Sequence, residues 1–176
     1  MKNKFYIYSF YQFTKIKDIY TLKDLLISEL SEKHMKGTIL LADEGINVSI
    51  AGNKTDLDLF LNFLKKILQI KNINIKINRC EFIPFNRMKV RLKKEIVSIG
   101  KSNIDAINCT AKEIDSNEWD IVIKDPNVKL IDVRNNYEIN IGKFKNSLNP
   151  KTNNFREFPK KFHDMNINKN DKIAMY

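Results

Sequence analysis

The first 80 residues alternate between short apolar runs and two amphipathic stretches. Residues 5–10 combine aromatic and β-branched side chains, a composition that predicts a strand. Thr21 and Asp24 have capping-box spacing, and the leucines that follow lie on one face of a predicted helix. These leucines are Leu22, Leu25, Leu26 and Leu30. Gly37 ends this helix, and the apolar residues 38–42 predict a buried strand.

A second helix is the clearest element of the pattern. It follows a turn at residues 43–45 and a predicted strand at 47–51. Its apolar residues recur at spacings that place them on one helical face. They are Leu57, Phe60, Leu61, Leu64, Ile67 and Leu68. Residues 73–77 then alternate between isoleucine and polar side chains, as in a half-buried strand. The resulting order, β-α-β-β-α-β, predicts a ferredoxin-like domain.

Residues 86–99 predict one further strand with an unusual distribution of charge. Met88, Val90, Leu92 and Ile96 are expected on one side, and four cations on the other. The four cations are Arg87, Lys89, Arg91 and Lys93. Successive cations would lie about 7 Å apart, comparable to the phosphates of a nucleic-acid strand. The pattern therefore predicts an RNA-binding face, although a lysine-rich exposed strand also prevents edge-to-edge aggregation.

The remaining sequence predicts a second, incomplete α/β domain. We expect a ferredoxin-like domain with the added basic strand at 1–99, a linker at 100–113, and this domain at 114–176. Asp115 and Glu118 have the spacing of a helix cap, and 128–131 form a buried apolar run. Two further elements are expected: a helical segment at 155–163 and a strand that begins at Ile173. Because the alternation stops inside a strand, 114–176 cannot close a doubly wound sheet by itself.

Composition narrows the functional classes. Hydrophobic residues make up 43% and charged residues 30% of the 176-residue chain, which is typical of a globular protein. The formal net charge is +10, and from Lys71 to Lys101 nine cations stand against two acids, so the charge is clustered. We find neither a signal peptide nor an apolar run of about 20 residues, so we expect a cytoplasmic protein with no membrane partner. Two histidines and two cysteines without CxxC spacing predict no structural metal.

A motif at the end of the first strand of the second domain suggests chemistry. Asp132 and Arg134 end the strand, Glu138 lies four residues later, and residues 142–147 follow as a turn. This arrangement resembles the rhodanese signature. Lys143 stands where that family has histidine, and Asn146 and Ser147 replace glycine and alanine.

Three further blocks, in the right order, make the resemblance more specific. They are residues 36–47, 89–97 and 155–159, with sequences KGTILLADEGIN, KVRLKKEIV and FREFP. Together with the rhodanese-like motif they resemble the rhodanese-related tRNA uridine hydroxylase family, from about residue 5 to residue 176. The resemblance implies an α/β (α+β plus α/β) chain in which a ferredoxin-like (acylphosphatase-like) domain precedes a rhodanese-like domain.

The resemblance also implies an activity. Members of this family use molecular oxygen as co-substrate to convert the wobble uridine of tRNA to 5-hydroxyuridine, so tRNA is the expected partner. Nothing in the sequence indicates how oxygen is activated, and the cofactor stays unknown. Two alternatives remain open: a rhodanese-type sulfurtransferase and a non-catalytic RNA-binding module.

The resemblance places the catalytic cysteine outside the sequence. In the family, the strand equivalent to 172–176 leads into a cysteine-containing, glycine-rich loop, so we expect the cysteine just beyond Tyr176 and expect this chain to be inactive alone. A loop of backbone N–H groups favours a thiolate. Asp132, Arg134 and Glu138 are expected to support that loop. An ordinary ion pair between the first two, and a capping role for Glu138, are the structural alternatives.

Cys80 and Cys109 do not match the family position. The adjacent acids Asp43 and Glu44 are expected to serve the turn and not to act as an acid/base pair, because adjacent turn residues point apart.

Overall fold

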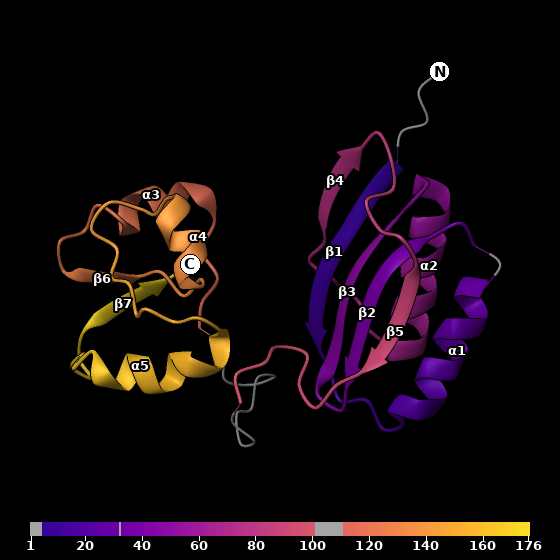
Figure 1. Cartoon of the computed structure of the whole chain (residues 1–176), viewed down its shortest axis with the longest axis horizontal. Helices are drawn as coiled ribbons and strands as arrows, with labels where there is room; N and C mark the ends of the chain where they lie inside the picture. Colours follow the sequence, from indigo (N-terminus) through magenta and orange to yellow (C-terminus); the bar gives the residue numbers. More distant parts are fainter. Residues whose placement is uncertain (1–4, 32, 101–110) are drawn as a thin grey trace. The chain divides into compact units, whose positions relative to one another are not determined.

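The computed structural model describes residues 5–31, 33–100 and 111–176, which form two compact units (Figure 1). The described part of the first unit ends at Val97, and that of the second comprises residues 98–100 and 111–176. Most of the predicted linker lies outside the described residues, so its boundaries stay a prediction.

The first unit is a mixed five-stranded sheet in the order β4-β1-β3-β2-β5. Its first four strands pair antiparallel, whereas β5 pairs parallel with β2. The strands are β1 (Phe5–Phe13), β2 (Lys36–Ala42), β3 (Gly45–Gly52), β4 (Lys76–Cys80) and β5 (Met88–Leu92). Helices α1 (Ile19–Ser31) and α2 (Lys54–Leu68) complete the predicted β-α-β-β-α-β order. The ferredoxin-like prediction is therefore confirmed.

Both helices of this unit lie on the same side of its sheet (Figure 1). Leucines at four-residue spacing bury one face of α1, and three apolar residues of α2 do the same. The buried helical residues are Leu22, Leu26, Leu30, Leu57, Phe60 and Leu64. They pack with Tyr8, Ile39 and Val48 from the sheet in one apolar core, and burial of this surface drives the folding of the unit.

The start of α1 corrects one prediction. Asp18 caps this helix: its carboxylate accepts hydrogen bonds from the backbone N–H groups of Tyr20 and Thr21 at 3.0 and 3.1 Å. The Thr21 hydroxyl also donates to Asp18, at 2.7 Å. The predicted capping box at Thr21 was wrong, because the helix already begins at Ile19. Leu25, expected in the apolar stripe, is 49% exposed.

The two edge strands differ from the predicted ones: β4 begins later along the chain, and β5 is shorter. β4 begins at Lys76, where it pairs with Ser9 of β1, and Ile77 is exposed. Ile73 and Ile75 precede the strand and still pack against the core. The strand predicted over 86–99 extends only from Met88 to Leu92, because pairing with β2 supports only that length.

Two glycines allow close approach within this sheet. A Cβ atom on Gly37 would lie 2.2 Å from the backbone oxygen of Ser49, and one on Gly45 would lie 2.2 Å from that of Gln12. Both residues have positive φ angles, 149° and 153°, that L-residues rarely adopt. Glycine is therefore needed where β3 meets its two neighbours.

The second unit is smaller and has a two-stranded parallel sheet of β6 (Val128–Ile131) and β7 (Lys172–Met175). Its helices are α3 (Ser116–Val122), α4 (Asn136–Ile141), the 3₁₀ turn η1 (Phe155–Glu157) and α5 (Phe158–Asp164). As predicted, Asp115 caps α3 by accepting from the N–H groups of Asn117 and Glu118 at 2.8 and 2.9 Å. The rhodanese-like assignment of this unit stays a prediction. Within the described residues, no helix is long and apolar enough to cross a membrane.

Candidate functional site

The basic strand β5 forms one edge of the first unit's sheet. Met88, Val90 and Leu92 pack against the apolar core, as predicted. Lys89 and Arg91 alternate with them and therefore project to the side away from the helices. Among the predicted cations, Arg91 is exposed and Lys89 is half-buried.

Arg87 and Lys93 flank β5 and extend its row of cations. Both are exposed. The Arg87 carbonyl accepts from the Gly37 N–H at 3.2 Å, and the Lys93 N–H donates to the Leu41 carbonyl at 2.7 Å. Backbone bonds to β2 thus hold all four predicted cations along one edge, although their role in RNA binding stays a prediction.

The side of the sheet away from α1 and α2 carries no helix of the first unit (Figure 1). We call it the open face. Strand register and alternation assign to it the polar or tyrosine residues Ser9, Tyr11, Lys36, Thr38, Asn47, Ser49, Lys76, Lys89 and Arg91. The same alternation places the apolar residues Phe5, Ile7, Phe13 and Leu40 on this face.

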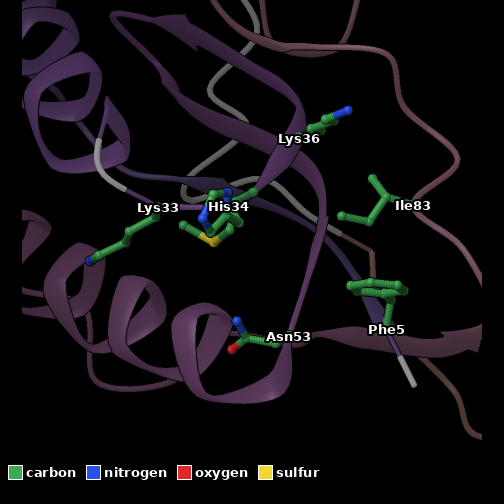
Figure 2. A pocket seen from close by; sticks show the side chains of 7 residues that line it. Phe5, Lys33, His34, Lys36, Asn53 and Ile83 are labelled. Carbon is green, nitrogen blue, oxygen red and sulfur yellow. The ribbon is translucent and has the colours of Figure 1, made fainter. Parts of the chain in front are cut away.

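A pocket of about 620 Å³ lies at one end of this unit (Figure 2). Its wall includes the aromatic ring of Phe5, the apolar side chain of Ile83, and the cation Lys36. The other lining residues are Lys33, His34, Met35 and Asn53. No acid lines the pocket, so its charge suits an anionic ligand with an apolar part.

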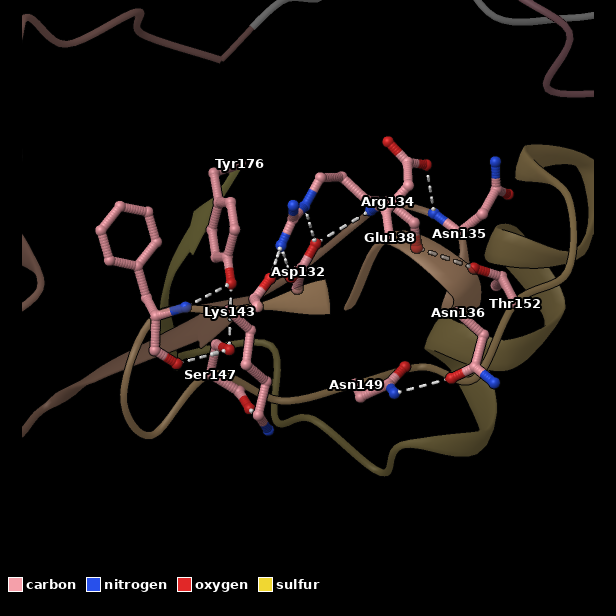
Figure 3. A network of polar contacts seen from close by, with 12 residues as sticks. Asp132, Arg134, Asn135, Asn136, Glu138, Lys143, Ser147, Asn149, Thr152 and Tyr176 are labelled. Atoms are coloured by element: carbon pink, nitrogen blue, oxygen red, sulfur yellow. Dashed lines mark hydrogen bonds and ion pairs between the residues drawn. The ribbon is translucent and has the colours of Figure 1, made fainter. Parts of the chain in front are cut away.

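In the second unit, the predicted strand-end motif forms a tight polar network (Figure 3). Asp132 follows β6 and is fully buried. Arg134 donates to both of its carboxylate oxygens, from Nε at 2.9 Å and from Nη2 at 2.6 Å. The backbone N–H of Arg134 adds a third bond at 3.1 Å. Nη2 of Arg134 also donates to the carbonyl of Gly142 at 2.7 Å, which ties the turn after α4 to the strand end.

Hydrogen bonds keep the Asp132 carboxyl and the Arg134 guanidinium in their charged forms. Burial alone would raise the pKa of Asp132, but hydrogen bonds from Arg134 and a contribution from Tyr176 outweigh it and lower that pKa. The same hydrogen bonds raise the pKa of Arg134. The pair is therefore ionised at neutral pH and acts as a charge-assisted brace.

Tyr176 closes the network from the end of the chain after β7. Its hydroxyl donates to Ser147 Oγ at 3.0 Å and accepts from the Phe144 N–H at 3.1 Å. The Arg134 guanidinium lies 5.4 Å from the centre of its ring. The ring of Trp119 in α3 packs at 5.9 Å from that of Phe144 and 6.0 Å from that of Tyr176.

Glu138 does not contact Arg134 in this network. Its carboxylate accepts from the backbone N–H of Asn135 at 3.1 Å, at the start of α4 (Figure 3). The capping alternative for Glu138 is therefore the one that the structure contains, and support of a loop by these three residues stays a prediction.

The acidic turn between β2 and β3 has a structural task. Glu44 Oε1 accepts from the Ile96 N–H at 2.7 Å, and Asn47 Nδ2 donates to the Ile96 carbonyl at 3.3 Å. Ile96 is buried, so both bonds fix the segment after β5 against the sheet. No local pattern in the sequence marks this clamp, because its partners lie about 50 residues apart.

The described ranges contain no cluster of metal-ligating side chains and one free cysteine, Cys80. No group of three or more His, Cys, Asp or Glu there could hold a metal ion. Cys80 is half-buried at the end of β4 and forms no disulfide. Cys109 lies outside the described residues.

Comparison with known proteins assigns the first unit. A family model described as the UPF0176 acylphosphatase like domain matches residues 5–96, which is more than half of the chain. The chain belongs to the UPF0176 family. The match covers the ferredoxin-like unit, β5 and the clamp at Ile96, and it confirms the acylphosphatase-like expectation.

Curated relatives match nearly the whole chain. A protein of Wolbachia sp. subsp. Brugia malayi (strain TRS), named tRNA uridine(34) hydroxylase, is 44% identical over 172 residues, 98% of this chain and 64% of its own length. A protein of the same name from Picosynechococcus sp. (strain ATCC 27264 / PCC 7002 / PR-6) is 40% identical over 98% of this chain and 58% of its own length. The chain thus spans about three fifths of the curated relatives. A solved acylphosphatase from Coxiella burnetii is 12% identical, covering 51% of this chain and 95% of its own, with a TM-score of 0.38.

Proposed function

We propose that this UPF0176 chain is part of a tRNA-modifying enzyme that hydroxylates the wobble uridine with molecular oxygen to give 5-hydroxyuridine. The observation that carries the proposal is the identity of 40 to 44% over 98% of the chain with relatives named tRNA uridine(34) hydroxylase. Both units contribute to these alignments, so the similarity is not restricted to one fold. A tRNA substrate makes the cytoplasm the proposed location.

We assign tRNA binding to the first unit. The cations Arg87, Lys89, Arg91 and Lys93 follow one sheet edge at a spacing suited to phosphates. The second unit contains the braced strand end, where two charge-assisted bonds join the Arg134 guanidinium to the Asp132 carboxylate after β6. Ligands of open α/β sheets bind at this end of the strands.

The experiment that tests the reaction is mass analysis of wobble uridine in tRNA from cells with and without the gene. We expect a uridine heavier by one oxygen atom, and its loss when the gene is deleted. Tests of the alternative function use thiosulfate: release of sulfite by the purified protein, with unchanged tRNA in the deletion strain, would favour the rhodanese-type sulfurtransferase.

The RNA-binding assignment has its own test. Charge reversal at Arg87, Lys89, Arg91 and Lys93 should weaken tRNA binding and make it less dependent on salt, since fewer counterions are released. The matched control reverses four lysines that belong neither to β5 nor to the residues flanking it: Lys15, Lys17, Lys23 and Lys71. Both variants have the same net charge, so an equal loss of binding in both would contradict a specific basic edge.

A further inference from the structure

The strands of the first unit contain no acidic residue. None of the five, β1 to β5, includes Asp or Glu, although the surrounding helices and turns contain both. Four of the five strand cations belong to the open face. They are Lys36, Lys76, Lys89 and Arg91. The positive charge of the open face therefore extends beyond β5 to β2 and to the opposite edge strand β4.

One line of paired residues crosses the open face from edge to edge. In register order it contains Lys76, Ser9, Ser49, Thr38 and Lys89. The hydroxyls of Ser9 and Ser49 lie 3.1 Å apart. Four strand spacings separate the two edge cations by about 19 Å. Short hydroxyl side chains between long cationic ones leave polar, low-lying surface in the middle of the face.

An aromatic ring stands beside this line. Tyr11 is 53% exposed and lies one row further along β1, in register with Asn47 of β3. Phe13 meets it edge to face, with ring centres 5.8 Å apart, and restricts its movement. An exposed ring held in this way is a stacking platform for a nucleobase.

The pocket lies toward the other end of the open face (Figure 2). Phe5 and Lys36, which line it, lie on neighbouring rows of the face, and Phe5 is six residues, or about 20 Å, along β1 from Tyr11. At about 7 Å per nucleotide, this length accommodates about three nucleotides. Its volume is within the range of small-ligand pockets, so one base could enter it.

We propose that the open face binds an unpaired segment of RNA, with one base stacked on Tyr11 and the phosphates beside Lys89 and Arg91. This inference rests on the proposed function, because it names the part of the tRNA that the first unit holds. A double helix does not suit the face, because its bases are stacked inside and offer no surface to Tyr11.

Anisotropy of a labelled RNA octamer tests the proposal with the 176-residue chain, in single-stranded form and as a duplex of the same sequence. We expect the single strand to bind at least tenfold more tightly. Tyr11→Ala should weaken its binding about tenfold without changing the salt dependence, because stacking releases no counterions. Tyr11→Phe should retain the affinity, since the ring remains.

The matched control is Tyr20→Ala on α1, where another exposed tyrosine lies outside the open face. It should bind as the unchanged chain does. The double variant Lys89→Gln with Arg91→Gln should reduce the salt slope by about 1.4, the value for two phosphates of a single strand. Circular dichroism confirms that each variant is folded.

The outcomes separate this inference from the function on which it rests. Preference for the duplex, or a Tyr11→Ala variant that binds normally, overturns the open-face proposal. If the four-cation reversal still weakens tRNA binding in that case, the proposed function stands and RNA follows only the β5 edge. The loss of hydroxylated uridine on deletion of the gene is measured separately in cells. None of these binding results would change what that measurement says about the reaction.

Discussion

The two units of the chain bury different kinds of side chain. The first unit encloses a continuous apolar core between one side of its sheet and two helices. Besides Pro150, the second buries four apolar residues in the described ranges, and all three buried polar residues of those ranges belong to it. These polar residues are Asp132, Ser147 and Thr152. The comparison shows that one fold depends on apolar area and the other on hydrogen-bond geometry, and these respond to different perturbations.

Removal of a large core side chain should have the largest effect, and only on the first unit. Phe60→Ala deletes a ring that is 1% exposed between α2 and the sheet. We expect the free energy of unfolding of this unit to fall by about 4 kcal/mol, through lost burial and the cavity left behind. Hydrogen exchange of the β1–β5 amides measures it. Leu59→Ala, at the exposed neighbouring position, should change that free energy by less than about 0.5 kcal/mol.

Loss of the brace should act on the second unit instead. Arg134→Met leaves the Asp132 carboxylate buried without its two guanidinium bonds, and we expect a loss of about 3 kcal/mol. The chain has a single tryptophan, Trp119, which packs within this unit, so its emission in urea reports this unfolding separately. Lys129→Met removes a partly exposed ion pair with Asp171 and should cost less than about 1 kcal/mol. Equal effects of the two variants would show that burial of Asp132 is unimportant.

Sequence patterns predicted the elements that local spacing determines. The face of α2 that contains Phe60 follows from apolar residues at helical intervals, and its burial is confirmed for three of the six. The same reasoning failed for Leu25, because an apolar residue at the edge of a helical stripe contacts the core only if the helix is rotated toward it. The ends of β4 and β5 likewise depend on pairing with residues of β1 and β2, which lie far away in the sequence.

The contacts of the candidate sites are likewise of two kinds: some follow from local spacing, and others form only because the fold brings distant residues together. Asp132 and Arg134 are two residues apart, and their pairing could be predicted from that spacing. Tyr176 reaches Ser147 from 29 residues away, and no sequence pattern marks such a contact. The open face became evident only when the register aligned residues of five strands, since each strand alone contributes one or two polar positions.

A buried tyrosine should make the first unit sensitive to alkali. Burial, and then the hydrogen bond to Asp58, raise the pKa of Tyr8 to about 12. Because the folded state holds this proton more tightly, its contribution is fully present below about pH 10 and is lost as the pH rises through 12. A shift of this size corresponds to about 2 to 3 kcal/mol.

Urea unfolding between pH 8 and 12 measures this contribution by circular dichroism, while Trp119 emission follows the second unit. Tyr8→Phe should remove most of the pH dependence of the first unit in that interval. Tyr20→Phe, at an exposed tyrosine, should leave it unchanged. A pH dependence that persists in Tyr8→Phe would assign the alkaline loss to other groups.

The smallest expected effect concerns the clamp that joins β2 and β3 to the segment after β5. Glu44→Ala leaves the buried N–H of Ile96 without its acceptor, and we expect a cost of about 1 to 2 kcal/mol to the first unit. Asp43→Ala changes the exposed neighbour, whose backbone carbonyl still accepts from Ile16, and should be nearly neutral. Hydrogen exchange at Ile96 distinguishes the two variants. If Glu44→Ala instead kept full stability and its Ile96 amide stayed protected, the acid would be free for chemistry, and the structural role assigned to it in the first unit would be wrong.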